Sequence, residues 1–149
     1  MNKIFLGGTC AETTWRDELI PGLEKYNVQY FNPVVEDWTP ECQAIEEDEK
    51  NNKCNVHLYV ITPEMQGVYS IAEIINSCWQ AQVYGTTVNY VAFYILDPEN
   101  KFSKGQLKSL NATIRLCNDI APNRFVGGKV NNMVDVLDSM LDFGILKLK

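Results

Sequence analysis

The chain has 149 residues, a length that favours a single domain over residues 1–149. Hydrophobic residues make up 46% of it and charged residues 21%, which excludes an intrinsically disordered protein. Nineteen acidic against thirteen basic side chains give a formal net charge of −6, a balance that argues against a nucleic-acid polymer as partner.

Strand-like and helix-like segments alternate from the first residues to the last. Apolar runs of strand length cover residues 4–6, 28–31, 56–61, 88–96 and 124–126. Apolar residues at helical spacing predict helices at residues 15–23, from residue 40 onward, 70–84, 105–118 and 130–143. The alternation predicts an α/β fold, a five-stranded parallel sheet with helices on both faces.

Local signals mark some of the helix boundaries. Thr39 and Pro40 are typical of a helix start, a capping hydroxyl followed by proline at the first helical position. We expect Pro21 and Gly22 to distort the last turns of the first helix. Gly85 stands in a stop position after the third helix.

Ligands of parallel α/β sheets bind beyond the carboxyl ends of the strands. The expected site therefore consists of the loops 7–14, 32–38, 62–70 and 97–103.

One histidine and five scattered cysteines restrict the chemistry. The single histidine, His57, excludes metal sites built on two or more histidines, and the absence of a CxxC pair argues against structural zinc, so no metal is expected. His57 lies inside a predicted strand, where a buried, hydrogen-bonded imidazole is favoured over a catalytic base. Cys10 is the only thiol in a predicted site loop, and we expect a substrate contact rather than a nucleophile.

The cellular setting is also an expectation from the sequence. The number of cysteines is odd, no leader segment is recognisable, and no apolar run is long enough to span a membrane. These features favour a reduced, cytoplasmic protein with no membrane partner.

Two loops offer features for contact with a small molecule. Gly7 and Gly8 follow the first strand and let a ligand approach the backbone closely, although the same pair is also typical of a tight turn. In the second loop, Trp38 offers a stacking face and Asp37 can fix a ribose or base edge. The alternative for Trp38 is that it packs its helix against the sheet.

Glu73 has two interpretations. A carboxylate at the start of a helix can attack the anomeric carbon of a sugar. The Ser70-x-x-Glu73 pattern is, however, also that of a capping box, in which Glu73 only bonds the helix start.

The acidic run 46–49 is predicted to lie mainly on a solvated helix face, because Glu46–Lys50 and Glu49–Lys53 have the spacing of ion pairs along a helix. At most one or two of its acids are expected to turn inward.

Six ordered segments resemble the nucleoside 2-deoxyribosyltransferase-like family, over residues 3 to about 96. The segments are residues 3–10, 14–16, 30–33, 37–41, 57–62 and 67–73. The resemblance implies a flavodoxin-like sheet, a pocket for a nucleoside or nucleotide, and a homodimer or higher homo-oligomer whose neighbouring chains complete the site. It requires no metal or organic cofactor.

The resemblance also implies roles for residues. Glu73 matches the glutamate that attacks C1′ of the sugar, and Glu47 falls where an acid assists protonation of the base. The expected substrate contacts are Gly7, Gly8, Thr9, Cys10, Trp15, Asn32, Asp37, Trp38, Gln66, Gly67, Tyr69 and Ser70. Arg16 is a candidate for a 5′-phosphate, unless it pairs with an acid.

The expected reaction is cleavage of an N-glycosidic bond, with transfer of the sugar to another base or to water. The alternative is a binding module on the same fold that sequesters or senses a nucleotide-derived molecule, with Glu73 acting only as a cap.

Overall fold

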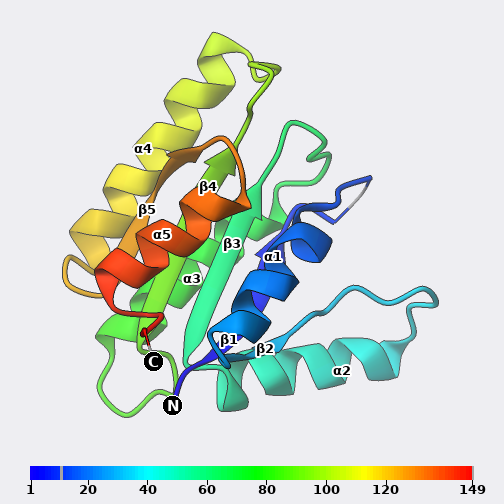
Figure 1. The fold of residues 1–149 in the computed structure, drawn as a ribbon, viewed down its shortest axis with the longest axis vertical. Coiled ribbons are helices and arrows are strands. Elements are labelled where there is room, and N and C mark those ends of the chain that lie inside the picture. Colours follow the sequence, from blue (N-terminus) through cyan, green and yellow to red (C-terminus); the bar gives the residue numbers. More distant parts are fainter. Residues whose placement is uncertain (11, 149) are drawn as a thin grey trace.

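The computed structural model describes residues 1–10 and 12–148, and within them five strands form one parallel sheet (Figure 1). The strands are β1 (Lys3–Gly8), β2 (Gln29–Phe31), β3 (Val56–Ile61), β4 (Tyr90–Leu96) and β5 (Phe125–Val130). Their order is β2-β1-β3-β4-β5, which is the flavodoxin-like order. The predicted α/β fold is therefore confirmed.

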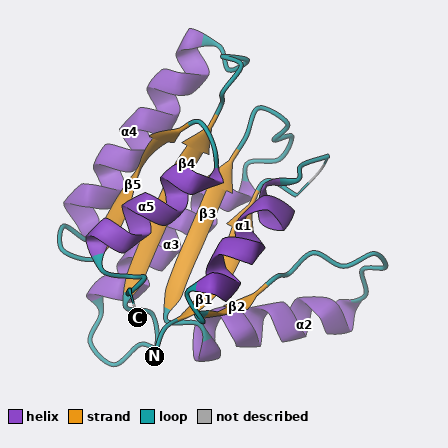
Figure 2. Ribbon diagram, viewed as in Figure 1, coloured by secondary structure: helices purple, strands orange, loops and turns teal. Residues whose placement is uncertain are grey.

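Helices cover both faces of the sheet (Figure 2). They are α1 (Trp15–Lys25), α2 (Pro40–Asp48), α3 (Tyr69–Gln82), α4 (Lys104–Ile120) and α5 (Met133–Phe143), and a π-helical turn, η1 (Glu49–Lys53), continues α2. Residues of α1 and α5 pack on one face, and residues of α3 and α4 pack on the other. None of the helices in the described part of the chain is long and apolar enough to cross a bilayer.

The central strand β3 shows why this sequence forms a two-sided core. All six of its residues are buried. Because side chains alternate along a strand, Leu58 and Val60 join the α1/α5 side, whereas Tyr59 and Ile61 join the α3/α4 side. The same alternation places His57 on the face with Tyr59, next to α3.

The strand order places a crevice between β1 and β3. The chain passes from β1 to one side, β2, and then returns to the other side, β3. At such a switch point the loops that follow the two strands diverge, and α/β proteins bind ligands there. The loops after Gly8 and after Ile61 therefore border the expected site.

Several predicted boundaries were wrong. Helix α3 ends at Gln82, with Val83 as its cap, instead of running to residue 84 before Gly85. Strand β5 extends to Val130 instead of ending at residue 126, and α5 begins at Met133, where the Asn132 side chain accepts a hydrogen bond from the Asp135 amide. In the added part of the strand, Gly127 lies opposite Phe93, and a Cβ there would be 2.1 Å from the Phe93 carbonyl oxygen.

Pro21 also differs from its expected effect. Helix α1 runs through Pro21 without interruption and ends at Lys25.

The Thr39–Pro40 helix start is confirmed, since the Thr39 hydroxyl accepts from the Cys42 amide at 3.4 Å. Helix α2 itself buries no residue, and Figure 1 shows it projecting with its preceding loop from the β2 edge of the sheet.

Gly127→Ala should lower the free energy of unfolding by about 2 kcal/mol or more, because the added methyl meets backbone that cannot move without disturbing β4. Gly105→Ala is the matched control, since the nearest atom to its added Cβ is 4.0 Å away, and it should cost nothing. Urea unfolding of both variants checks this, and equal stabilities would contradict the packing described for β5.

Candidate active site

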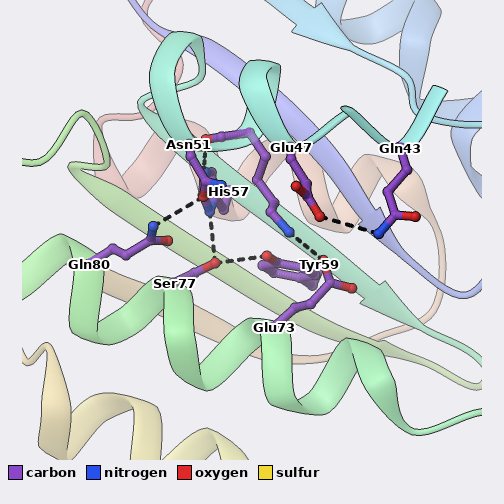
Figure 3. Close-up of polar contacts among 9 residues, drawn as sticks. Gln43, Glu47, Asn51, His57, Tyr59, Glu73, Ser77 and Gln80 are labelled. Carbon is purple, nitrogen blue, oxygen red and sulfur yellow. Dashed lines mark hydrogen bonds and ion pairs between the residues drawn. The ribbon is translucent and has the colours of Figure 1, made fainter. Parts of the chain in front are cut away.

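Glu73 forms an ion pair with Lys50 across the space between α3 and η1 (Figure 3). The Lys50 Nζ lies 2.7 Å from Glu73 Oε2, and the two side chains are only 12% and 15% exposed. Helix α3 begins at Tyr69, and its cap residue Val68 makes no side-chain capping bond. The capping-box interpretation of Ser70 and Glu73 is therefore wrong, because the carboxylate of Glu73 is engaged by Lys50 instead.

A buried hydrogen-bonded chain lies beside this ion pair. His57 Nε2 is 2.6 Å from the Lys50 carbonyl oxygen, and His57 Nδ1 is 2.7 Å from Ser77 Oγ. Because a carbonyl only accepts, Nε2 carries the proton, and Nδ1 accepts from the Ser77 hydroxyl. Ser77 Oγ in turn accepts from the Tyr59 hydroxyl at 2.7 Å. We call His57, Ser77 and Tyr59 the His57 relay.

The environment of His57 favours its neutral form. Burial lowers the pKa of His57 to about 4, since a charged imidazole would lose its hydration. Both ring nitrogens are engaged inside the fold. The prediction of a buried, hydrogen-bonded histidine is therefore confirmed.

Among the acids of the run 46–49, Glu46 is the one that turns toward Glu73, a role that the sequence did not predict for it. Glu46 is partly buried, and burial, followed by the negative charge of Glu73, raises its pKa. Glu47 is exposed and accepts from Gln43 Nε2 at 3.3 Å (Figure 3). Glu49 lies toward β1, where it pairs with Lys3 at 2.7 Å. The four-residue spacing between Glu46 and Lys50 was the one sequence feature that drew attention to Glu46, but it favoured an ion pair on a solvated helix face.

The two glycines at the end of β1 are required by close packing. A Cβ on Gly7 would lie 2.7 Å from the Tyr59 ring, and a Cβ on Gly8 would lie 2.1 Å from the Val60 carbonyl oxygen. Gly8 also has a φ of +110°, which disfavours other residues. The Thr9 amide donates to the Val60 carbonyl at 3.0 Å. The loop after β1 is thus fixed to the end of β3, next to the relay residue Tyr59.

Arg16 supports this loop from the other side. Its guanidinium is buried, donates to the carbonyl oxygens of Leu6 at 3.1 Å and Thr9 at 2.9 Å, and stacks on the Trp15 ring at 4.3 Å. Its hydrogen bonds among the described residues go to backbone carbonyls and to the Cys10 sulfur, so the alternative that Arg16 pairs with an acid is wrong, and its role toward a 5′-phosphate stays a prediction. Burial lowers the pKa of Arg16.

A cavity of about 250 Å³ opens where the loops after β1 and β3 meet. Its lining includes Gly8, Thr9, Cys10, Gln66, Gly67, Tyr69 and Ser70, which are all predicted substrate contacts. Glu73 follows Tyr69 and Ser70 by one turn of α3. The structure therefore brings these contacts together next to the helix that carries the proposed nucleophile.

A larger cavity of about 480 Å³ lies elsewhere along the carboxyl ends of the strands. Its lining includes Trp15, Thr62 and Asp97, together with the start of α5. Neither Lys50 nor Glu73 lines either cavity, but Glu73 follows the smaller cavity by one turn of α3. Trp15 is buried, and its Nε1 donates to the Thr9 carbonyl at 3.0 Å, so this predicted contact lies apart from the smaller cavity.

The loop between β2 and α2 stays away from both cavities. Trp38 is 61% exposed, so the alternative that it packs α2 against the sheet is wrong. Asp37 is also exposed, and the Asn32 side chain accepts from the Val34 amide at 3.1 Å. These three predicted contacts are not brought to the cavity lining within this one chain.

Comparisons with known proteins identify the family and support the fold. A family model described as "Nucleoside 2-deoxyribosyltransferase like" matches residues 1–83, which span β1 to α3 and contain the Lys50–Glu73 ion pair, the His57 relay and the lining of the smaller cavity. The solved structure titled "Crystal structure of conserved protein from Enterococcus faecalis V583" is similar with a TM-score of 0.57 at 11% identity, covering 94% of this chain and 97% of that chain. This likeness shows the fold alone. No curated protein matches the chain significantly.

The buried imidazole should make stability depend on pH. Its pKa is about 4 in the folded protein against 6.5 without burial, so the unfolded chain binds more protons between these values. The stability from neutral His57 is present above pH 6.5 and is lost as the pH falls toward 4, by about 3 kcal/mol in total. Urea unfolding at stepped pH, with an NMR titration of the single imidazole, checks this. A folded imidazole that titrates near 6.5 would contradict its burial.

Proposed function

The chain belongs to the nucleoside 2-deoxyribosyltransferase-like family, and from that membership we propose that it cleaves the N-glycosidic bond of a 2′-deoxynucleoside or its 5′-nucleotide. The observation that carries the proposal is the Glu73 carboxylate, partly buried and held by Lys50 one turn along α3 from the cavity between β1 and β3. Carboxylates of this kind can act as nucleophiles toward a sugar.

The proposed reaction has two steps. In the first, a Glu73 oxygen bonds to C1′ while the bond from C1′ to the base nitrogen breaks, and the base leaves with the electron pair and takes up a proton. In the second, water or another base attacks C1′, loses a proton and restores the carboxylate. Both transition states resemble an oxocarbenium ion, which the nearby negative charge stabilises.

The geometry favours Glu46 over Glu47 as the acid that protonates the leaving base. Burial and the negative charge of Glu73 raise the pKa of Glu46, which is the direction of shift that a proton donor requires. Glu47 remains the candidate implied by the family resemblance, but its carboxylate accepts from Gln43 on the exposed side of α2. Asp37 is a further carboxylate that could serve as this acid, but it is exposed in the loop before α2.

The smaller cavity supports the placement of the sugar. The close packing of Gly7 and Gly8 leaves backbone, rather than side chains, at this end of β1. Tyr69 on the opposite side of the cavity is 74% exposed and offers an aromatic face for a base. Exposed Trp38 could add a second face only from the projecting loop.

Glu73→Gln should lower the rate of base release at least about a thousandfold, because the amide keeps the shape and loses the nucleophile. Glu46→Gln should slow substrates with poor leaving bases more than Glu47→Gln does, and Glu41→Gln, at an exposed glutamate of the same helix, is the matched control with near wild-type rates. The measurement is chromatography of free base from a panel of deoxynucleosides and their 5′-monophosphates.

Two outcomes oppose the reaction. Full activity of Glu73→Gln would exclude the nucleophile. A wild-type protein that binds a nucleotide but releases no base, as inert as Glu73→Gln, would establish the binding module instead.

We also propose that the protein forms a homodimer through α2 and α3. Helix α2 has nine residues and buries none of them, and isolated helices this short are marginal in water. Large apolar side chains are exposed nearby, with Ile45 at 57% and both Trp79 and Val83 at 56%. A second copy covering these residues would stabilise α2 and could bring Trp38 of one chain to the cavity of the other.

Trp79→Glu should shift the protein toward monomer, because a buried carboxylate has no partner in an apolar interface. Leu116→Glu is the matched control, since Leu116 is a comparably exposed apolar residue on α4. Light scattering coupled to size-exclusion chromatography measures the mass. A monomeric wild-type protein, or equal effects of the two substitutions, would contradict the proposed interface.

A further inference from the structure

Lys50 is held at both ends by residues of the candidate site. Its carbonyl oxygen accepts from His57 on β3, and its ammonium contacts Glu73 on α3. We propose that Lys50 is the residue that positions Glu73 for attack, and that the His57 relay sets where Lys50 stands. The proposal rests on the function proposed above, in which Glu73 is the nucleophile.

The ion pair engages one oxygen of the carboxylate. Lys50 Nζ donates to Oε2 at 2.7 Å. This contact fixes the rotation of the carboxylate and leaves Oε1 as the oxygen to be directed at C1′. Holding a nucleophile in one orientation lowers the entropic part of the barrier, and misplacement by about 1 Å can cost about a hundredfold in rate.

The Lys50 side chain has little freedom along its length. Its ammonium lies 5.7 Å from the centre of the Phe5 ring on β1, and only 12% of the side chain is exposed. Its backbone is in the π-helical turn η1, a geometry that occurs often at functional sites. An ordinary surface lysine samples many rotamers, whereas this one is confined.

The relay connects this turn to the helix that carries Glu73. Ser77 follows Glu73 by four residues on α3, so both side chains lie on one face of the helix. Ser77 bonds His57, and His57 bonds the Lys50 carbonyl, which closes a ring of contacts back to Glu73 (Figure 3). The distance between η1 and α3 is thereby fixed.

A second link extends the same helix face. Gln80 Nε2 donates to Asn51 Oδ1 at 3.1 Å (Figure 3). Residues 73, 77 and 80 thus all face the turn or the strand beside it. Burying polar groups of this kind costs free energy, because the groups lose their hydration. A buried network that ends at the proposed nucleophile therefore suggests a role in holding its geometry in addition to stability.

The kinetic test uses two lysines from the same turn. Lys50→Met should lower kcat by tenfold to about a hundredfold and leave KM within about threefold, because binding is retained and orientation is lost. Lys53→Met is the matched control, since exposed Lys53 pairs with Asp48 and Glu49 and, among the described residues, with no other acid. Lys50→Arg, which can still contact the carboxylate, should recover part of the loss.

The relay is tested with two buried tyrosines. Tyr59→Phe removes the hydroxyl that bonds Ser77 and should lower kcat about fivefold or more. Tyr94→Phe removes an equivalent bond to Ser139 at 2.8 Å on the α1/α5 side, and should change stability but not kcat. A purely structural role for Tyr59 would give both variants the same kcat.

The tautomer of His57 gives a readout that needs no turnover. Two-bond ¹H–¹⁵N NMR of ¹⁵N-labelled, tag-free protein shows one imidazole, because the chain has one histidine. The expected spectrum is that of the neutral ring protonated at Nε2. A ring protonated at Nδ1 would overturn the relay, because Nε2 could then not donate to the Lys50 carbonyl.

The outcomes separate this inference from the proposed function. If wild type and Glu73→Gln release base equally, the function fails, and the positioning role fails with it. If release depends on Glu73 but Lys50→Met performs like Lys53→Met, the function stands and the positioning role alone is overturned.

Discussion

The pairing of β1 with β3 is the constraint on which the rest of the site depends. It places Gly7 so close to Tyr59, and Gly8 so close to Val60, that no side chain fits between the strands. The loop after β1 is then fixed by the Thr9–Val60 hydrogen bond and by the carbonyl contacts of Arg16. The cavity between the two loops is a consequence of this packing.

The second constraint on the site is the arrangement of its buried charges, an ion pair beside a neutral histidine. Removing a lysine and a glutamate from water is costly, and an apolar pair of the same size is often at least as stable. The Lys50–Glu73 pair therefore contributes geometry more than stability. The neutral relay next to it keeps a second positive charge out of the site, because burial holds His57 unprotonated at neutral pH.

The sequence was sufficient for the sheet, because apolar runs of strand length are unambiguous when helices separate them. It was insufficient for β5, where two glycines and a lysine interrupt the apolar run after Val126. It was also insufficient for α3, where Ser70 and Glu73 imitate a capping box although the helix starts at Tyr69. Lys50 could not be found, because helical spacing pairs it with Glu46. Only the π-helical turn and the His57 bond direct it to Glu73.

The most direct test of the account is to trap the glycosyl–enzyme intermediate. A substrate with fluorine at C2′ and a good leaving base slows both steps through their oxocarbenium-like transition states, so an intermediate can accumulate. Intact-mass spectrometry should then show one sugar added to the wild-type protein, and peptide mapping should place it on Glu73. Base release without any adduct, or an adduct on another residue such as Cys10, would contradict the account.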